Sequence, residues 1–101
     1  QVDGLEIPAY VFSPLETRPR AQAAMVWVHG GVHGNWDQNY LPFIIEAVQR
    51  GYVILAPEYR GSTGYGEAHH RAIDYGGKEL DDVETAHAVL QARPEGDPAR
   101  I

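Results

Sequence analysis

Short apolar runs of strand length occupy the first half of the chain, and each run ends near a proline or glycine. Residues 5–13 alternate between apolar and polar positions from Ala9 onward, which predicts a strand that ends before Pro14. Residues 23–28 and residues 52–56 are apolar without alternation. Such runs are typical of strands that are covered on both faces in a parallel sheet. The polar residues 15–22 predict an exposed turn.

Three- and four-residue spacing of apolar positions appears from about Asp37 and predicts a helix that Gly51 caps. Its apolar face consists of Tyr40, Leu41, Ile44, Ile45 and Val48.

Two further helices are expected over residues 67–75 and residues 78–92, after a glycine-rich loop at residues 61–66. One side of the longer helix carries Leu80, Val83, His87 and Leu90. Residues 99–101 are expected to be the start of another strand. Buried strands that alternate with helices predict an α/β fold with a mostly parallel sheet and helices on both faces.

Composition excludes several classes of protein. The chain has 101 residues, of which 44% are hydrophobic and 22% charged, so wholesale disorder is excluded. No apolar run reaches the ~18 residues of a membrane span. The net charge of −6 and the single lysine argue against a nucleic-acid partner. The absence of cysteine excludes thiolate nucleophiles and cysteine metal sites. We expect no cofactor and, as a working expectation, a soluble cytoplasmic protein, while the oligomeric state stays open.

His29, Gly30 and Gly31 directly follow the run at residues 23–28. Ligands of open α/β sheets bind beyond the carboxyl ends of the strands. A His-Gly-Gly turn at that place can direct backbone N–H groups into a pocket, where they stabilise a developing oxyanion. The same tripeptide also forms ordinary tight turns, so both interpretations stay open at this point.

The remaining histidines favour structural roles. His29 and His33 lie four residues apart with Asp37 beyond, but no helix aligns them, so we expect no metal site. His69 and His70 are adjacent and would diverge on a helix, which favours a solvated pair. His87 is interpreted as a residue at the boundary of an apolar face.

Two serines are present, Ser13 and Ser62. A nucleophile elbow has the pattern Gly-x-Ser-x-Gly. Ser62 does not fit this pattern because Arg60 stands where the first glycine belongs. The chain therefore contains a candidate oxyanion loop without a candidate nucleophile.

Five stretches together resemble the catalytic domain of the prolyl oligopeptidase family of serine peptidases, most closely its acylaminoacyl-peptidase and dipeptidyl-aminopeptidase branch. They are residues 26–31 (VWVHGG), 47–57 (AVQRGYVILAP), 59–66 (YRGSTGYG), 76–83 (GGKELDDV) and 97–101 (DPARI). The resemblance implies an α/β-hydrolase fold, of which residues 1–101 would form the N-terminal portion of one catalytic domain, truncated before the nucleophile elbow.

The resemblance also implies a function and its residues. It implies a serine peptidase that cleaves peptides through an acyl-enzyme, with the Gly31 N–H as an oxyanion donor, Gly30 permitting the turn and His29 packing behind it. We expect Val32 and Trp36 to line the substrate mouth, with packing as the alternative. The catalytic serine, aspartate and histidine would lie beyond residue 101, and a β-propeller could precede residue 1. The alternatives are a carboxylesterase of the same fold, which would take an ester substrate, and an inactive remnant or binding module.

Two further expectations concern stability. Without the strand that should flank residues 23–28, we expect the isolated 101-residue piece to be poorly soluble or molten. Asp81 and Asp82 are interpreted, with Glu79 and Glu84, as part of a solvated face, with one carboxylate tied to Arg60 or a neighbouring loop.

Overall fold

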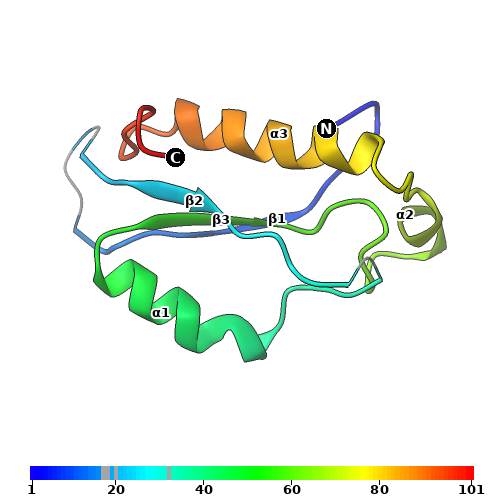
Figure 1. Ribbon diagram of the computed structural model, residues 1–101, viewed down its shortest axis with the longest axis horizontal. Helices are drawn as coiled ribbons and strands as arrows, with labels where there is room; N and C mark the ends of the chain where they lie inside the picture. The colour runs from blue at the N-terminus through cyan, green and yellow to red at the C-terminus, as the bar shows by residue number, and fades with distance from the viewer. Residues whose placement is uncertain (17–18, 20, 32) are drawn as a thin grey trace.

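The central strand of the sheet, β3 (Val53–Pro57), is buried along its whole length. The computed structural model describes residues 1–16, 19, 21–31 and 33–101. In it β3 pairs in antiparallel orientation with β1 (Ala9–Phe12) and in parallel orientation with β2 (Ala24–Val26), so that β3 lies between them (Figure 1). Because Ala24 lies opposite Val53 and Val26 opposite Leu55, the carboxyl ends of β2 and β3 lie at the same edge of the sheet.

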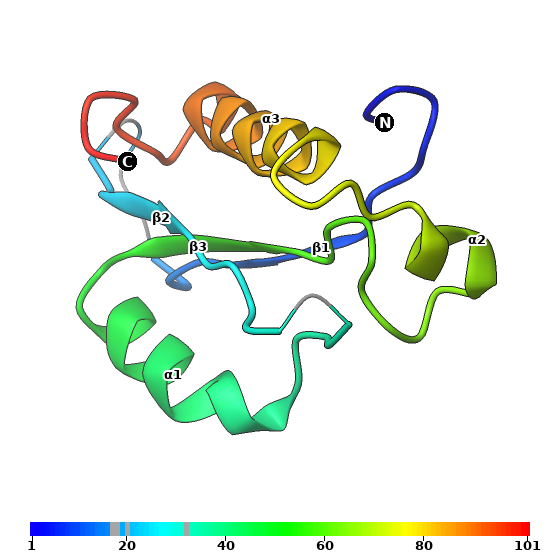
Figure 2. The ribbon, with the colours of Figure 1, turned by 45° about the vertical axis from the view of Figure 1, so that its right-hand side comes forward.

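Helices cover both faces of this mixed sheet, which confirms the predicted α/β arrangement. The helical elements are η1 (Gln38–Tyr40), α1 (Leu41–Gln49), α2 (Glu67–Arg71) and α3 (Lys78–Ala92). Helices α1 and α3 lie on opposite faces, and α2 lies beyond one end of the sheet (Figure 2). Within the described residues, no helix is both long and apolar enough to cross a bilayer.

The hydrophobic core between the sheet and α3 is small. It consists of Ala24, Val53, Leu55, Ala86 and Leu90, with Val26 and Ile101 packed against it. On the opposite face, α1 contributes Ile44, which is 2% exposed. Burial of these side chains fixes the orientation of β2 and β3, and therefore of the loops that follow them.

The predicted element boundaries agree with the structure better than the predicted faces do. Helix α3 has the expected bounds, but Leu80 is 56% exposed and His87 is also exposed, whereas Asp82 and Ala86 are buried. In α1, Ile45 is 51% exposed instead of facing the core. The expected face of each helix was therefore partly wrong, because sequence spacing does not show which neighbours each side chain meets.

The edges of the sheet also differ from expectation. Strand β2 is shorter than residues 23–28, and Val28 is 48% exposed. Residues 97–101 form no strand, but the Arg100 carbonyl accepts a hydrogen bond from the Ala24 N–H (3.0 Å) and the Asp97 N–H donates to the Gln22 carbonyl (2.8 Å). This segment therefore runs beside β2, where the sequence predicted a neighbouring strand. Of the predicted turn at residues 15–22, positions 17, 18 and 20 lie outside the described residues, and Leu15 is exposed.

Candidate active site

The His-Gly-Gly loop begins at the carboxyl edge of the sheet. The Trp27 N–H donates to the Leu55 carbonyl (2.9 Å), which extends the pairing of β2 by one residue. The His29 side chain then turns inward and is 3% exposed, whereas Gly30 and Gly31 are exposed. Gly31 has a φ of +63°, a conformation that residues with a side chain rarely adopt. The glycine at this position therefore allows the chain to reverse at the surface.

A second loop, residues 58–62, follows β3 and packs against the His-Gly-Gly loop. The Ser62 Oγ lies 2.7 Å from the His29 Nε2, and the Tyr59 ring stacks on the imidazole with 4.3 Å between centroids. The Tyr59 hydroxyl lies 3.0 Å from the His29 carbonyl oxygen and 2.9 Å from the Gly31 carbonyl oxygen, so that one O–H serves both. Burial raises the pKa of Tyr59, and the nearby Tyr40 and Glu58 add to the effect. The phenol therefore stays protonated at neutral pH and remains a donor.

The His29 ring also fixes the plane of the next peptide. Its Nδ1 lies 3.2 Å from the Gly30 carbonyl oxygen. In a trans peptide the C=O and N–H point in opposite directions, so the Gly31 N–H points away from the ring. The Gly30 N–H is occupied by the Tyr40 hydroxyl (3.3 Å). Among the described residues, the Gly31 N–H has no hydrogen-bond acceptor, and this leaves it available for a ligand.

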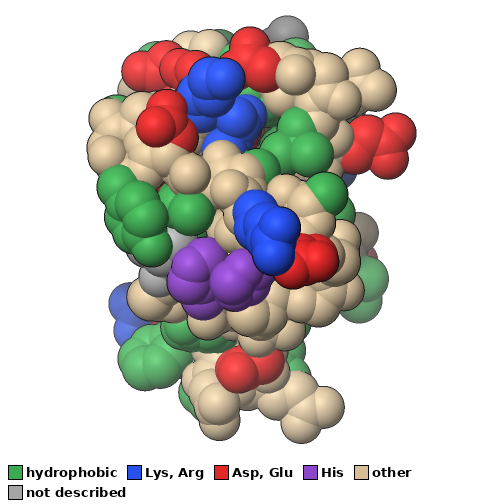
Figure 3. Space-filling model, turned by 90° about the vertical axis from the view of Figure 1, so that its right-hand side faces the viewer, with side chains coloured by type: hydrophobic (Ala, Val, Ile, Leu, Met, Phe, Trp, Pro, Cys, Tyr) green, Lys and Arg blue, Asp and Glu red, His purple; other side chains and the backbone are tan. Residues whose placement is uncertain are grey.

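Residues 33 and 34, which continue the His-Gly-Gly loop, also contact the segment after β3. The His33 Nδ1 lies 2.9 Å from the Gly61 carbonyl oxygen, and the Thr63 N–H donates to the Gly34 carbonyl (2.7 Å). The His33 and His70 rings stack with centroids 3.7 Å apart. Histidine side chains are visible at the surface of the end of the molecule where α2 lies (Figure 3, purple). Loop 33–36 is thus tied both to the segment after β3 and to α2.

Trp36 lies in an aromatic cluster with residues of β1 and η1. Its ring centroid is 5.0 Å from that of Phe12, 5.2 Å from that of Tyr10 and 6.4 Å from that of Tyr40. The indole Nε1 is buried and has no hydrogen-bond partner among the described residues. This packing agrees with the alternative given for Trp36, and its contact with substrate stays a prediction. Val32, the other expected residue of the substrate mouth, lies outside the described residues.

Glu58 is a buried carboxylate beneath this loop. It is 1% exposed, accepts a hydrogen bond from the Trp36 N–H (2.7 Å), and its Oε1 lies 3.8 Å from the His29 Nε2. Burial raises the pKa of Tyr65, as do its hydrogen bonds with Tyr10 and Glu58. Glu58 therefore joins β3 to the loop on one side and to the glycine-rich segment on the other.

The buried position of Asp82 contradicts the predicted solvated face, whereas its contact with Arg60 agrees with the predicted tie to that residue. Asp82 was expected on a solvated face, but it is 2% exposed and bound to Arg60, which is 3% exposed. The hydrogen bond with Asp82 raises the pKa of Arg60. The tie to Arg60, expected for one carboxylate of this group, is therefore present, and the exposed neighbour Asp81 remains solvated.

The prediction that His69 and His70 form a solvated pair is also wrong. His69 is 4% exposed, and its Nε2 lies 3.0 Å from the carbonyl oxygens of both Glu58 and Tyr59. The His69 carbonyl in turn accepts a hydrogen bond from the Gly61 N–H (2.8 Å). His69 therefore stabilises the loop at residues 58–62, while His70 stacks against His33.

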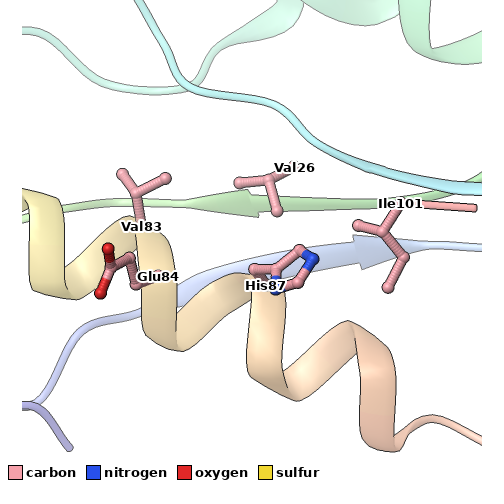
Figure 4. Close-up of a pocket in the computed structure, with 5 residues that line it drawn as sticks. All are labelled: Val26, Val83, Glu84, His87 and Ile101. Carbon is pink, nitrogen blue, oxygen red and sulfur yellow. The ribbon is translucent and has the colours of Figure 1, made fainter. Parts of the chain in front are cut away.

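A groove of about 560 Å³ lies between β2 and α3, away from the loop. It is lined by Val26, Val83, Glu84, His87 and Ile101 (Figure 4). The residues of the His-Gly-Gly loop do not contribute to its walls. His87 thus faces an open groove between apolar side chains, in agreement with its interpretation as a boundary residue.

Sequence reasoning missed Tyr59, Ser62 and Glu58 as partners of the loop. One signal was available: these residues follow β3, just as His29 follows β2, and the two strands are parallel neighbours. Residues that follow adjacent parallel strands meet at one edge of the sheet.

The model of the prolyl oligopeptidase family matches residues 32–101 of the chain. Among curated proteins, the chain is 28% identical over 103 residues to the uncharacterized peptidase YuxL of Bacillus subtilis, a match that covers 98% of this chain and 16% of that protein. It is 30% identical over 95 residues to the acylamino-acid-releasing enzyme of Sus scrofa, covering 90% of this chain and 13% of that protein.

Two further similarities agree with these. The dipeptidyl-peptidase 5 of Schizosaccharomyces pombe is 31% identical over 86 residues, which covers 80% of this chain and 13% of that protein. A puromycin-hydrolyzing peptidase of Mycobacterium tuberculosis superposes with a TM-score of 0.77 at 30% identity, over 93% of this chain and 15% of that one. The chain thus spans less than a fifth of the length of these relatives.

Proposed function

Because the chain belongs to the prolyl oligopeptidase family, we propose that the complete protein is a serine peptidase and that its Gly31 N–H is one donor of the oxyanion hole. The observation that carries this proposal is the N–H of the exposed residue Gly31, which has no acceptor among the described residues and belongs to a peptide whose carbonyl is bound by His29. In the proposal, the serine, histidine and aspartate of the catalytic triad lie beyond residue 101.

The chemistry follows from this geometry. Attack of the serine on a carbonyl produces a tetrahedral intermediate whose oxygen carries a negative charge. A donor already aligned with that oxygen stabilises the charge without reorganisation, and the loss of one such donor typically lowers turnover by ~10²–10³. His29 and Tyr59 maintain this alignment, because they hold the carbonyls on either side of Gly31.

Peptides are the proposed substrates in preference to esters. The names of the relatives support this choice, since they include a dipeptidyl-peptidase and an acylamino-acid-releasing enzyme. Comparison of an acylaminoacyl or aminoacyl p-nitroanilide with a p-nitrophenyl ester, both on the complete protein, tests it. Hydrolysis of the ester alone would favour a carboxylesterase, and no labelling by a fluorophosphonate would favour an inactive remnant.

The role of Gly31 is tested by replacing it with glycolic acid, which exchanges the N–H for an ester oxygen and keeps the chain geometry. We expect kcat/KM for a peptide anilide to fall by ~10²–10³. Glycolic acid at Gly64, which lies in an exposed turn, is the matched control and should leave the rate unchanged. Equal rates for the Gly31 ester and the unmodified enzyme would contradict the proposed donor.

A further inference from the structure

Ser62 lacks the pattern of a nucleophile, yet its side chain is fully buried, with 0% exposure. Its Oγ lies 2.7 Å from the Nε2 of His29, which is itself 3% exposed. The Glu58 Oε1 lies 3.8 Å from this nitrogen, beyond hydrogen-bond distance. Among the described residues, Ser62 is therefore the hydrogen-bond partner of the His29 Nε2.

The direction of this hydrogen bond follows from the other side of the ring. The His29 Nδ1 faces the Gly30 carbonyl oxygen at 3.2 Å, and a carbonyl oxygen can only accept. Nδ1 therefore carries the proton, and in a neutral imidazole Nε2 is then an acceptor. The Ser62 hydroxyl must be the donor to Nε2.

We propose that Ser62 is a positioning residue of the oxyanion hole: its hydroxyl fixes the Nδ1–H form of His29, which holds the Gly30 carbonyl and thereby orients the Gly31 N–H. This inference rests on the proposed function of Gly31. The chain of donors runs from Ser62 through the imidazole to the Gly30–Gly31 peptide, and hydrogen bonds arranged in one direction strengthen one another.

The Ser62 hydroxyl is itself held in place by the backbone around it. The Ser62 N–H donates to the Tyr59 carbonyl (3.0 Å), and the Gly61 N–H donates to the His69 carbonyl (2.8 Å). The Arg60 N–H donates to the buried Asp82 carboxylate (2.9 Å). Three consecutive backbone N–H groups are therefore bound, so this turn presents its hydroxyl at a fixed position.

Removal of the hydroxyl leaves the buried Nε2 without its donor. The ring can then move its proton to Nε2, facing Glu58, and the Gly30 carbonyl loses the N–H that holds it. The Gly31 N–H remains present but is less well aligned. We therefore expect Ser62→Ala to lower kcat/KM about tenfold, which is less than the loss of the donor itself.

The experiment uses the complete protein and the variants Ser62→Ala, Ser62→Cys and Ser13→Ala. Ser13 is the exposed second serine of the chain and provides the same substitution away from the loop. A peptide aldehyde, which forms a tetrahedral adduct, reports on the oxyanion hole, and a product peptide reports on ground-state binding. Nitrogen-15 spectra of labelled histidine, assigned by comparison with a His29→Gln variant, report which ring nitrogen carries the proton.

We expect Ser62→Ala to weaken aldehyde binding about tenfold while product binding changes little. Ser62→Cys, with its weak S–H donor, should fall between the alanine variant and the wild type, and Ser13→Ala should match the wild type. The His29 signal should change from Nδ1–H to Nε2–H or to a mixture in Ser62→Ala.

An unchanged His29 signal, or equal loss of aldehyde and product binding, would overturn the role of Ser62. A wild-type protein that neither labels with fluorophosphonate nor hydrolyses peptides would instead contradict the proposed function. The spectra would still decide whether Ser62 sets the proton position on His29.

Discussion

The carboxylate of Asp82 accepts three hydrogen bonds from Arg60, two from the guanidinium (2.8 and 2.9 Å) and one from the backbone N–H (2.9 Å). Both side chains are buried, at 4% exposure or less. The pair connects the N-terminal third of α3 to the turn that carries Ser62. The position of the candidate active-site loops therefore depends on a contact between residues 22 positions apart in the sequence.

Asp82→Ala is expected to destabilise the protein by about 3–5 kcal/mol. The Arg60 cation then stays buried with only the longer contacts to the Asp3 carboxylate (3.9 Å) and the Val2 carbonyl (3.5 Å). Denaturant unfolding of the complete protein measures this loss. Asp81→Ala is the control, since Asp81 is exposed, and should change stability by less than ~0.5 kcal/mol. The double variant Arg60→Met/Asp82→Leu should be more stable than Asp82→Ala alone. Equal stability of the two single variants would contradict the importance of the pair.

Tyr59→Phe removes the hydroxyl that both the His29 and Gly31 carbonyls accept from. We expect a loss of about 1 kcal/mol in stability, the usual contribution of such a hydrogen bond. We also expect a fall in kcat at nearly constant KM, because loop alignment matters most in the transition state. Tyr75→Phe, at a residue 73% exposed, is the control. A rise in KM with unchanged kcat would argue that Tyr59 serves substrate binding instead.

Gly34→Ala tests how closely the two ends of the loop approach. A Cβ at this position would lie 2.9 Å from the Gly30 carbonyl oxygen, so the backbone of the loop must move. We expect kcat/KM to fall with only a small change in the melting temperature. Gly4→Ala should instead lower the melting temperature and leave kcat/KM unchanged. Gly4 has a φ of +78° and no neighbouring atom within 4 Å of its Cβ position, so alanine there adds backbone strain of about 1 kcal/mol far from the loop.

Asp97 contributes a pH-dependent term to stability. The Ala99 N–H and the Arg100 guanidinium hold the pKa of Asp97 below its ordinary value of 3.8. A carboxylate with a depressed folded-state pKa stabilises the fold above its unfolded-state pKa, and this stabilisation is lost as the pH falls through the folded-state value. Urea unfolding between pH 6 and pH 3 should therefore show a shallower loss of stability for Asp97→Asn than for the wild type. Parallel curves would exclude this contribution.

Residues 1–101 expressed alone are expected to be molten or poorly soluble. Phe43 is 61% exposed and Ile45 is 51% exposed, and the groove beside β2 is open. A sharp cooperative melt with a strong near-ultraviolet circular dichroism signal would contradict this expectation, whereas dye binding with retained secondary structure would agree with it.

Local sequence patterns predicted the elements but not their orientation. Helix α3 runs from Lys78 to Ala92 as expected, because apolar spacing and the preceding glycines are local signals. The buried position of Asp82 was missed because its partner, Arg60, lies far away in the sequence, in the loop after β3. A charged residue looks solvated in sequence until its partner is located in space.

The candidate site shows the same division. The place of His29–Gly31 after a buried strand was predictable, since ligands bind at the carboxyl ends of such strands. The roles of Tyr59 and Ser62 depend on hydrogen bonds across about thirty residues of sequence, formed once β2 and β3 pair. The adjacent His69 was misjudged for a related reason, since its partners are backbone carbonyls rather than side chains.

The hydrogen bond between the Ala24 N–H and the Arg100 carbonyl determines where any extension of the chain arrives. Residues that continue beyond Ile101 in extended conformation, parallel to β2, advance about 3.3 Å per residue in step with that strand. His29 lies five residues after Ala24, so the residue about five positions after Arg100 would come level with the loop. The register of this backbone contact thus determines which residue of such an extension comes level with the Gly31 N–H, and a one-residue insertion just after Arg100 would shift that residue by one position.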